Sequence, residues 1–301
     1  MGQKDNEELY SWAVRTGHYS YEQLVDFADD NLSDQETIAR FFYYWIALHI
    51  DYDDSITMGD INNTRQGAQS VQVNTVFASK KTTCLGFTNL YHSFLRHFNI
   101  SHRLVVGYTR SPINVLEGIE PQEDHAWSAV MLNDQWHLVE ITWANQYIDD
   151  PYARDYYFKT DPAEMMLQHF PKKEEWQLLE EPWSFEKFVK SPLLDPWYLS
   201  RSTPGQELIQ TGKNAKGEIV ITCLRPTKWK LSLKAVNQHD QDLGNLKYKV
   251  NRNGNTLQFT LKKYDGKSHL RLDAIRIGVN SSEIEAPGLA YFIDITKSLK
   301  H

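Results

Sequence analysis

The chain has 301 residues, 41% of them hydrophobic and 13% aromatic, which is enough for packed cores and, by length, for two domains rather than one. Thirty-nine acidic residues against 32 basic ones give a formal net charge of -7, and no basic cluster offsets it, so nucleic acid is not expected as a partner. No run of about 18 apolar residues occurs, so no membrane span is expected.

Two cysteines, Cys84 and Cys223, lie far apart in the sequence, and we expect them in different domains and not joined by a disulfide. The first residues, Met-Gly-Gln-Lys-Asp, do not resemble a signal peptide. Two localisations therefore stay open: extracytoplasmic (secreted or periplasmic) if a signal segment was removed, and otherwise cytoplasmic. The oligomeric state is not predicted.

The first predicted element is a helix over residues 33–50. Ser33 and Glu36 form a capping box at its start, in which the hydroxyl and the carboxylate satisfy free backbone N–H groups. Residues 51–75 are polar and irregular. A second helix begins at Cys84, and its apolar positions recur every three or four residues. These positions are Phe87, Leu90, Tyr91, Phe94, Leu95 and Phe98.

After the second helix the hydrophobic period changes to two, which predicts strands. Three strands are expected, over residues 102–109, 126–132 and 135–142. Residues 111–124 are expected to form a loop, and residues 161–180 a helix.

A cluster of prolines then predicts a domain boundary. They are Pro182, Pro192, Pro196 and Pro204. Beyond residue 200, short alternating strands predict an all-β sandwich of about 100 residues, with Asn253-Gly254 as one hairpin turn. The expected strands cover residues 218–224, 229–236, 246–250, 257–262, 269–277 and 290–295. We predict domains over residues 1–195 and 200–301, the second of them immunoglobulin-like.

Cys84 is the first candidate for chemistry. Only the thiolate form of cysteine is a useful nucleophile, and the unpaired N–H groups at a helix start favour negative charge. Thr82 and Thr83 are both suitable N-caps for this helix, and Gly86 leaves room for a substrate or another backbone segment. A buried structural cysteine is the alternative.

A hairpin across Asn133-Asp134 would pair the second and third predicted strands. Leu132 would then face Gln135, and the same register would place Trp127 opposite Glu140. Residues directly opposite one another share a face of the sheet, and so do residues two apart on one strand.

His125 and Glu140 therefore lie on one face as diagonal neighbours, with Cβ atoms about 7 Å apart at most. A glutamate can span that distance and accept a hydrogen bond from the imidazole. Asp124 and His137 fall on the opposite face. The alternative is that His125 and Glu140 are ordinary polar residues of the strands.

Cysteine, histidine and carboxylate in this order form the parts of a thiol nucleophile with its base and its orienting group. The segments that carry them resemble the transglutaminase-like superfamily: Thr83-Cys84-Leu85-Gly86-Phe87, His125-Ala126-Trp127, and Trp136 to Trp143. Three later segments narrow the resemblance to the kyphoscoliosis-peptidase branch. These are Tyr156 to Pro162, His169-Phe170-Pro171 and Trp176-Gln177-Leu178-Leu179. The resemblance covers roughly residues 33–185.

The resemblance implies an α+β fold whose papain-like core has an antiparallel sheet and a helix bearing the nucleophile, followed here by the all-β sandwich. It also implies that Cys84 is the nucleophile and His125 the general base and then acid. Glu140 stands where the family usually has aspartate, and we expect it to hold the imidazole as a Ser-His-Glu triad does elsewhere.

The resemblance further implies two hydrogen-bond donors for an oxyanion. The Cys84 backbone N–H is one candidate. An upstream side-chain amide is the usual second donor, and we favour Gln72 among the available residues. The others are Gln66, Gln69 and Asn74.

Aromatic residues near these motifs could line a substrate cleft, with core packing as the alternative for each. They are Trp127, Trp143, Tyr108, Tyr147, Tyr152, Tyr156 and Tyr157. His92, His97 and His102 do not form a metal-ligand pattern, and Asp53-Asp54 lacks the alternating ligands of a calcium loop. We predict no metal and no cofactor.

The sequence therefore predicts a thiol enzyme that acts on amide bonds of a peptide or protein through a thioester acyl-enzyme, in the manner of a cysteine peptidase. Acyl transfer to an amine, as in a transglutaminase, shares the same intermediate and is the first alternative. A non-enzymatic protein-binding scaffold on the same fold is the second.

Overall fold

The computed structural model of the chain forms two compact units. The described residues are 3–111, 120–191, 193–194, 209–224, 229–239, 241–244, 246–254, 256–264, 269–276 and 288–293. The first unit holds residues 1–108, 123–162 and 171–180, and the second holds 109–122, 163–170 and 181–301. The predicted domains over 1–195 and 200–301 stay a prediction, and residues 112–119 of the predicted loop lie outside the described residues.

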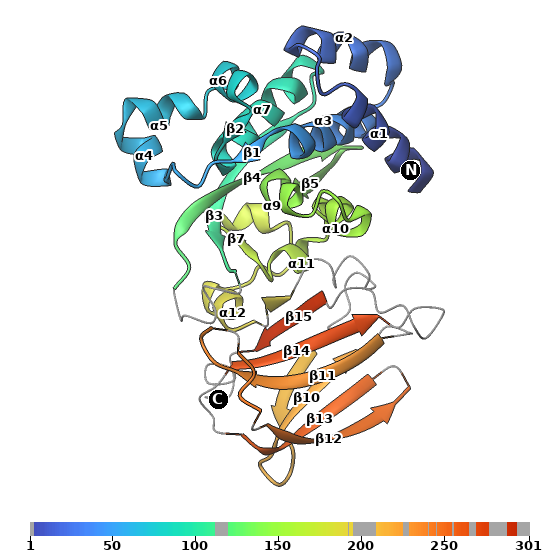
Figure 1. Ribbon diagram of the computed structural model, residues 1–301, viewed down its shortest axis with the longest axis vertical. Helices are drawn as coiled ribbons and strands as arrows, with labels where there is room; N and C mark the ends of the chain where they lie inside the picture. The colour runs from blue at the N-terminus through green and yellow to red at the C-terminus, as the bar shows by residue number, and fades with distance from the viewer. Residues whose placement is uncertain are drawn as a thin grey trace. The chain divides into compact units, whose positions relative to one another are not determined.

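The first unit combines helices with an antiparallel sheet, as the predicted α+β class requires (Figure 1). Its helices are α1 (Gln3–Arg15), α2 (Tyr21–Asn31), α3 (Gln35–His49), α4 (Met58–Asn63), α5 (Arg65–Ser70), α6 (Val73–Ser79), α7 (Cys84–His97), α9 (Ile141–Gln146) and α10 (Pro151–Tyr156). Its sheet has the order β6-β5-β4-β3. These strands are β3 (His102–Thr109), β4 (Glu123–Leu132), β5 (Gln135–Val139) and β6 (Phe158–Thr160). A separate parallel pair joins β1 (Asp51–Tyr52) to β2 (Lys81–Thr82).

Helices α3 and α7 form the core of this unit and pack against each other (Figure 1). The rings of Phe42 and Phe94 stack with centroids 4.1 Å apart, and both side chains are fully buried. Trp45 stacks on Phe77 of α6 at 5.4 Å. Helix α7 also packs against β4, so the first residue of α7 is held against the sheet by a rigid aromatic core.

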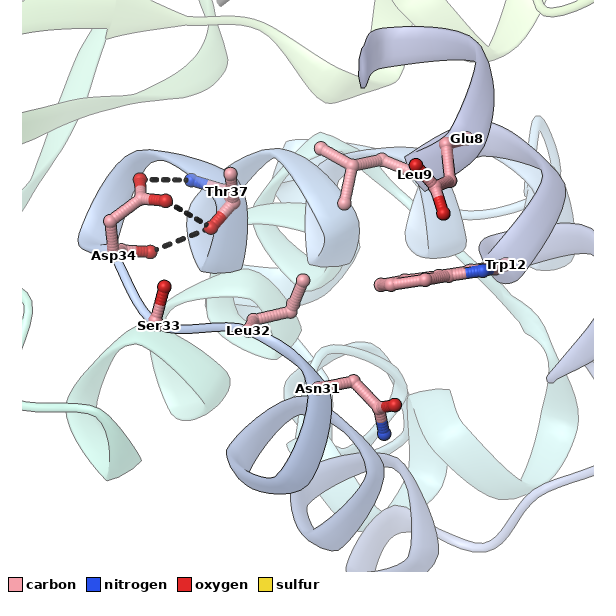
Figure 2. Close-up of a pocket in the computed structure, with 8 residues that line it drawn as sticks. All are labelled: Glu8, Leu9, Trp12, Asn31, Leu32, Ser33, Asp34 and Thr37. Carbon is pink, nitrogen blue, oxygen red and sulfur yellow. Dashed lines mark hydrogen bonds between the residues drawn. The ribbon is translucent and has the colours of Figure 1, made fainter.

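Helix α3 begins one residue later than its predicted capping box requires. Asp34, not Ser33, is the N-cap, and its carboxylate accepts a hydrogen bond from the backbone N–H of Thr37 at 2.9 Å. The Thr37 hydroxyl donates to the same carboxylate at 2.8 Å, as Figure 2 shows at the edge of a small pocket. The ionised Asp34 carboxylate accepts two hydrogen bonds from Thr37, whereas the Ser33 hydroxyl would accept one, so Asp34 is the favoured N-cap.

Residues 58–79 contain the three short helices α4, α5 and α6, although the sequence predicted most of this stretch to be irregular. Thr57 and Asp60 form a reciprocal capping box at the start of α4, and the Thr64 hydroxyl caps α5. These helices are short and polar, with Ile61 and Val76 among their few buried side chains, so hydrophobic periodicity gives no sign of them.

The three predicted strands of the first unit are present as β3, β4 and β5. Strand β4 begins three residues before its predicted start, whereas β5 ends at Val139 instead of residue 142. The chain turns into α9 after Glu140, which is the N-cap of that helix.

The predicted helix over 161–180 is wrong. That stretch contains only the four-residue helix α11 (Pro162–Met165), the short strand β7 (His169–Pro171) and a 3₁₀ turn over Glu174–Gln177. Leu178 adopts a positive φ of 55°, which a continuing helix does not allow.

After the short helix α12 (Phe185–Lys190), the described residues of the second unit form strands and no further helix. It has two four-stranded antiparallel sheets, β12-β13-β10-β9 and β11-β14-β15-β8. Alternate side chains such as Ile221, Cys223, Leu257 and Phe259 are buried, which confirms the predicted sandwich pattern. The strands are β8 (Leu193–Leu194), β9 (Ile209–Lys213), β10 (Ile219–Leu224), β11 (Trp229–Val236), β12 (Lys247–Asn253), β13 (Thr256–Lys263), β14 (His269–Arg276) and β15 (Gly288–Ile293).

Asn253 pairs with Thr256 and therefore belongs to β12, although it was expected in the hairpin turn; residue 255 lies outside the described residues. Residues 294 and 295 of the last predicted strand lie outside the described residues.

Candidate active site

Cys84 is the first residue of α7 and only 2% exposed. Thr83 occupies the N-cap position, but its side chain makes no capping hydrogen bond. The Cys84 sulfur lies 3.9 Å from the backbone carbonyl oxygen of Asp124, at the start of β4. The thiol is therefore at the helix start, as predicted, and adjacent to the strand that carries His125.

A close contact between Gly86 and the Thr82 side chain fixes the position of this helix start. The Thr82 hydroxyl donates to the Ser70 carbonyl oxygen at 2.9 Å, and Thr82 is fully buried in β2. Gly86 lies so near Thr82 that a Cβ atom on Gly86 would be 2.7 Å from both Cβ and Cγ2 of Thr82. Glycine is therefore required two residues after the thiol.

The β4–β5 hairpin has the predicted register. Leu132 pairs with Gln135 and Ser128 with Val139, and Asn133 and Asp134 both have positive φ, of 52° and 60°, as a two-residue type I′ turn requires. Extending this register past the end of β5 brings Glu140 toward His125. The His125 Nε2 atom lies 2.8 Å from Glu140 Oε2, so the predicted contact is confirmed.

Glu140 uses both carboxylate oxygens. Oε2 accepts from His125, and Oε1 accepts from the backbone N–H of Trp143 at 3.2 Å, which caps α9. The Glu140 backbone N–H donates to the Tyr157 carbonyl oxygen at 2.9 Å. The side chain is fully buried, so its position is fixed at both ends and it in turn fixes the imidazole.

The charges around His125 favour its protonated form. Burial alone would lower the pKa of the imidazole, but the Glu140 carboxylate and a hydrogen bond with the Cys84 side chain outweigh it and raise that pKa to about 10. Since Nε2 faces Glu140, Nδ1 is the ring nitrogen left for the sulfur. An imidazolium beside a sulfur is the partner that a thiolate nucleophile requires.

Two tryptophans flank the imidazole. The ring of Trp127 stacks on that of His125 with centroids 6.0 Å apart, and Trp143 lies at 6.2 Å. Trp127 is only 1% exposed, whereas Trp143 is partly exposed. Both contact the imidazole, and a role in lining a substrate cleft stays a prediction for each.

The other predicted residues lie away from these contacts or in the core. Gln72 is an exposed N-cap of α6 without a side-chain capping bond, and Gln66, Gln69 and Asn74 are also exposed. Their role as oxyanion donors stays a prediction. Tyr157 is fully buried, and Tyr147 and Tyr156 pack against the same core, so packing is the role that these contacts support. The pocket of Figure 2 is lined by Glu8, Leu9, Trp12, Asn31, Leu32, Ser33, Asp34 and Thr37, and so does not include the thiol.

A pair of neighbouring histidines, His92 of α7 and His102 of β3, was not predicted from the sequence. His92 is buried and lies 3.1 Å from the Ser128 hydroxyl through its Nε2, and its ring centroid is 4.4 Å from that of His102. Burial, His102 and Arg96 lower the pKa of His92 to about 3. The imidazole is thus held neutral in the folded protein.

The protein is therefore expected to lose stability in acid through His92. Its pKa is about 3 when folded and ordinary, near 6.5, when unfolded. The unfolded chain binds the extra proton between these values, so the free energy of unfolding falls as pH drops from about 6.5, by up to about 1.4 kcal/mol per unit.

Denaturant titrations between pH 4 and 7 measure this slope. A His92→Gln variant should show a shallower slope than the parent, while His97→Gln, at an exposed position on the same helix, should keep the parent's slope. Equal slopes in all three proteins would contradict the assignment.

Comparison with known proteins shows which family the sequence resembles. The pattern of the transglutaminase-like superfamily matches residues 22–141. The kyphoscoliosis peptidase of Homo sapiens is 27% identical over 251 residues, which cover 79% of this chain and 37% of that protein. That of Mus musculus is 29% identical over 230 residues, covering 72% of this chain and 33% of that protein. A solved structure described as that of a TGase aligns with a TM-score of 0.29 and 20% identity, over 46% of this chain and 31% of the other.

Residues 22–141 thus match the transglutaminase-like superfamily, and the predicted papain-like core is confirmed. The curated relatives also support the predicted resemblance to the kyphoscoliosis-peptidase branch, as the later motifs indicated. The chain spans about a third of the length of these two curated relatives, at 37% and 33%.

No helix in the described ranges has both the length and the apolar character needed to cross a bilayer. Both cysteines are free, and Cys223 is fully buried in the second unit. Burial raises the pKa of the Cys223 thiol to about 12.

Proposed function

We propose that the protein is a thiol enzyme that cleaves amide bonds in peptides or proteins through Cys84, His125 and Glu140. The observation that carries the proposal is the buried imidazole, which binds the Glu140 carboxylate at 2.8 Å and also interacts with the Cys84 side chain. This is the geometry in which a nucleophile, its base and an orienting group act together.

The reaction follows from these positions. The Cys84 thiolate attacks the amide carbonyl carbon and forms a tetrahedral adduct. The carbon–nitrogen bond then breaks as His125 gives its proton to the leaving amine, which leaves a thioester on the sulfur. His125 next takes a proton from water, whose oxygen attacks the thioester, and the acid and the thiolate are released.

One observation supports hydrolysis as the main outcome: the curated relatives from Homo sapiens and Mus musculus both carry the name peptidase. Transfer of the acyl group to an amine would proceed from the same thioester, so an amine competing with water tests that alternative directly.

The burial of the thiol favours a second candidate, a non-enzymatic protein-binding scaffold. Cys84 is 2% exposed and His125 is 7% exposed, which leaves little of either side chain in contact with solvent. A scaffold would keep the three residues as a structural network, and its thiol would not react.

Alkylation by iodoacetamide separates these candidates. In the enzyme Cys84 is expected to react quickly at pH 7, because the neighbouring imidazolium favours the thiolate form. Cys223 serves as an internal control, since burial raises the pKa of its thiol to about 12. A Cys84→Ala variant should lose the fast label. Labelling of Cys84 at pH 7 that is no faster than labelling of Cys223, or no labelling of Cys84, would refute the proposed function.

A further inference from the structure

Tyr52 stands beside the candidate thiol, on a strand that the sequence did not predict. Strand β1 pairs in parallel with β2, with Tyr52 opposite Thr82. The Asp51 backbone N–H donates to the Lys80 carbonyl oxygen, and that of Asp53 to the Thr82 carbonyl oxygen, both at 2.8 Å. Backbone bonds on both sides of Tyr52 therefore fix it near the residues that precede α7 (Figure 1).

The side chain of Tyr52 lies against the first turn of the nucleophile helix. Its ring stacks on that of Phe87, with centroids 6.5 Å apart and planes inclined by 27°. Phe87 is fully buried three residues after Cys84, whereas Tyr52 is 38% exposed. The ring is thus anchored on one face and open to solvent on another, as a residue at the mouth of a site would be.

The hydroxyl of Tyr52 is in electrostatic reach of the site. After burial, the groups that act most on it are Cys84, Asp54, Asp124 and Glu140, and together they raise the pKa of Tyr52 to about 12. The phenol therefore keeps its proton at any pH at which the thiol would work. Among the residues that the structure describes, none hydrogen-bonds to this hydroxyl, so its proton is available to a ligand.

An acyl-transfer site needs such a donor. Negative charge develops on the carbonyl oxygen when the thiolate attacks, and pre-positioned donors stabilise it. The Cys84 backbone N–H can supply one hydrogen bond, because the first N–H groups of a helix have no partner within the helix. A phenol that stays protonated, as Tyr52 does, can supply the second hydrogen bond.

We propose that Tyr52 is a further catalytic residue, whose hydroxyl donates a hydrogen bond to the carbonyl oxygen of the acyl group as that oxygen becomes negatively charged. This inference rests on the proposed function of Cys84. In this proposal the phenol of Tyr52 is the second oxyanion donor, a role for which the sequence suggested a side-chain amide.

The test compares two reactions of the same sulfur. Acylation by p-nitrophenyl acetate passes through an oxyanion, whereas alkylation by iodoacetamide is a displacement at a saturated carbon and does not. Tyr52→Phe should slow acylation by roughly 100-fold, the usual cost of losing one oxyanion donor. The same variant should keep alkylation within about twofold of the parent, since the thiolate and His125 are untouched.

A matched control is Tyr21→Phe, which removes a hydroxyl that donates to Ser93 at 3.2 Å and is not among the groups that contact Cys84. Both of its rates should equal those of the parent. Equal losses of acylation and alkylation in Tyr52→Phe, or no loss of either, would overturn the role of Tyr52. Parent-like acylation in Cys84→Ala would instead overturn the proposed function, and the role of Tyr52 with it.

Discussion

Replacing Glu140 with Gln is expected to slow acylation of Cys84 by about 10³–10⁴-fold, the size of effect that a carboxylate-to-amide change has in a serine-protease triad. The parent carboxylate accepts two hydrogen bonds, from His125 Nε2 and from the Trp143 backbone N–H. An amide has only one oxygen, so its NH₂ group must face one of these donors.

Either orientation of the amide damages the site. If the NH₂ group faces His125, Nε2 must give up its proton, and the remaining proton moves to Nδ1, which then cannot accept one from the thiol. If the NH₂ group faces Trp143, the cap of α9 is lost, at a cost of about 1 kcal/mol. The first arrangement predicts the loss of rate, and the second predicts a loss of stability.

Glu140→Asp is the informative partner of this variant. It keeps the charge but is one methylene shorter, so it reaches His125 or the Trp143 N–H but not both. We expect acylation to fall far less than in Glu140→Gln, because the ionised carboxylate still holds the imidazolium.

Burst acylation by p-nitrophenyl acetate gives the rates, and urea unfolding gives the stabilities of both variants. Acylation in Glu140→Gln within threefold of the parent would show that the carboxylate does not orient the base. Glu140→Ala is expected to lose more stability, about 3–5 kcal/mol, because it removes the carboxylate from a buried ion pair with His125.

The local geometry of this site was predictable because strand pairing follows a strict period. Once Asn133-Asp134 is taken as a two-residue turn, the positions of His125 and Glu140 follow from alternation alone. The end of β5 was not predictable in the same way. Ile141, Thr142 and Trp143 have strand-like side chains, and glutamate is not a usual N-cap residue. The helix begins there because the Glu140 side chain satisfies the Trp143 N–H.

Tyr52 and the short helices before Cys84 were missed for a different reason. Strand β1 has two residues and takes its position from hydrogen bonds to β2, which follows it by about thirty residues in the sequence. Hydrophobic periodicity does not report contacts of this kind. The capping box of Thr57 and Asp60 was visible in the sequence and could have identified α4.

Replacing Gly86 with Ala is expected to destabilise the first unit by about 3 kcal/mol or more, at the upper end of what overpacking a core costs. The new Cβ would overlap the Thr82 hydroxyl and lie 2.7 Å from Thr82 Cβ and Cγ2. Thr82 cannot rotate away freely, since its hydroxyl donates to the Ser70 carbonyl oxygen at 2.9 Å. Relief therefore requires β2 to separate from the start of α7, which displaces the Cys84 sulfur from His125 and lowers acylation as well.

Gly59→Ala is the control for this change. Gly59 is also helical, in α4, but a Cβ there would have Thr57 Oγ1 at 3.4 Å as its nearest neighbour, an ordinary contact. Since Ala exceeds Gly in helix propensity by about 1 kcal/mol, this variant should match or exceed the parent in stability. Urea unfolding monitored by tryptophan fluorescence compares the two. Equal stabilities of Gly86→Ala and Gly59→Ala would mean that α7 can move away from β2 without loss of stability. That result would contradict the conclusion that contact with Thr82 fixes the start of α7, and with it the position of Cys84.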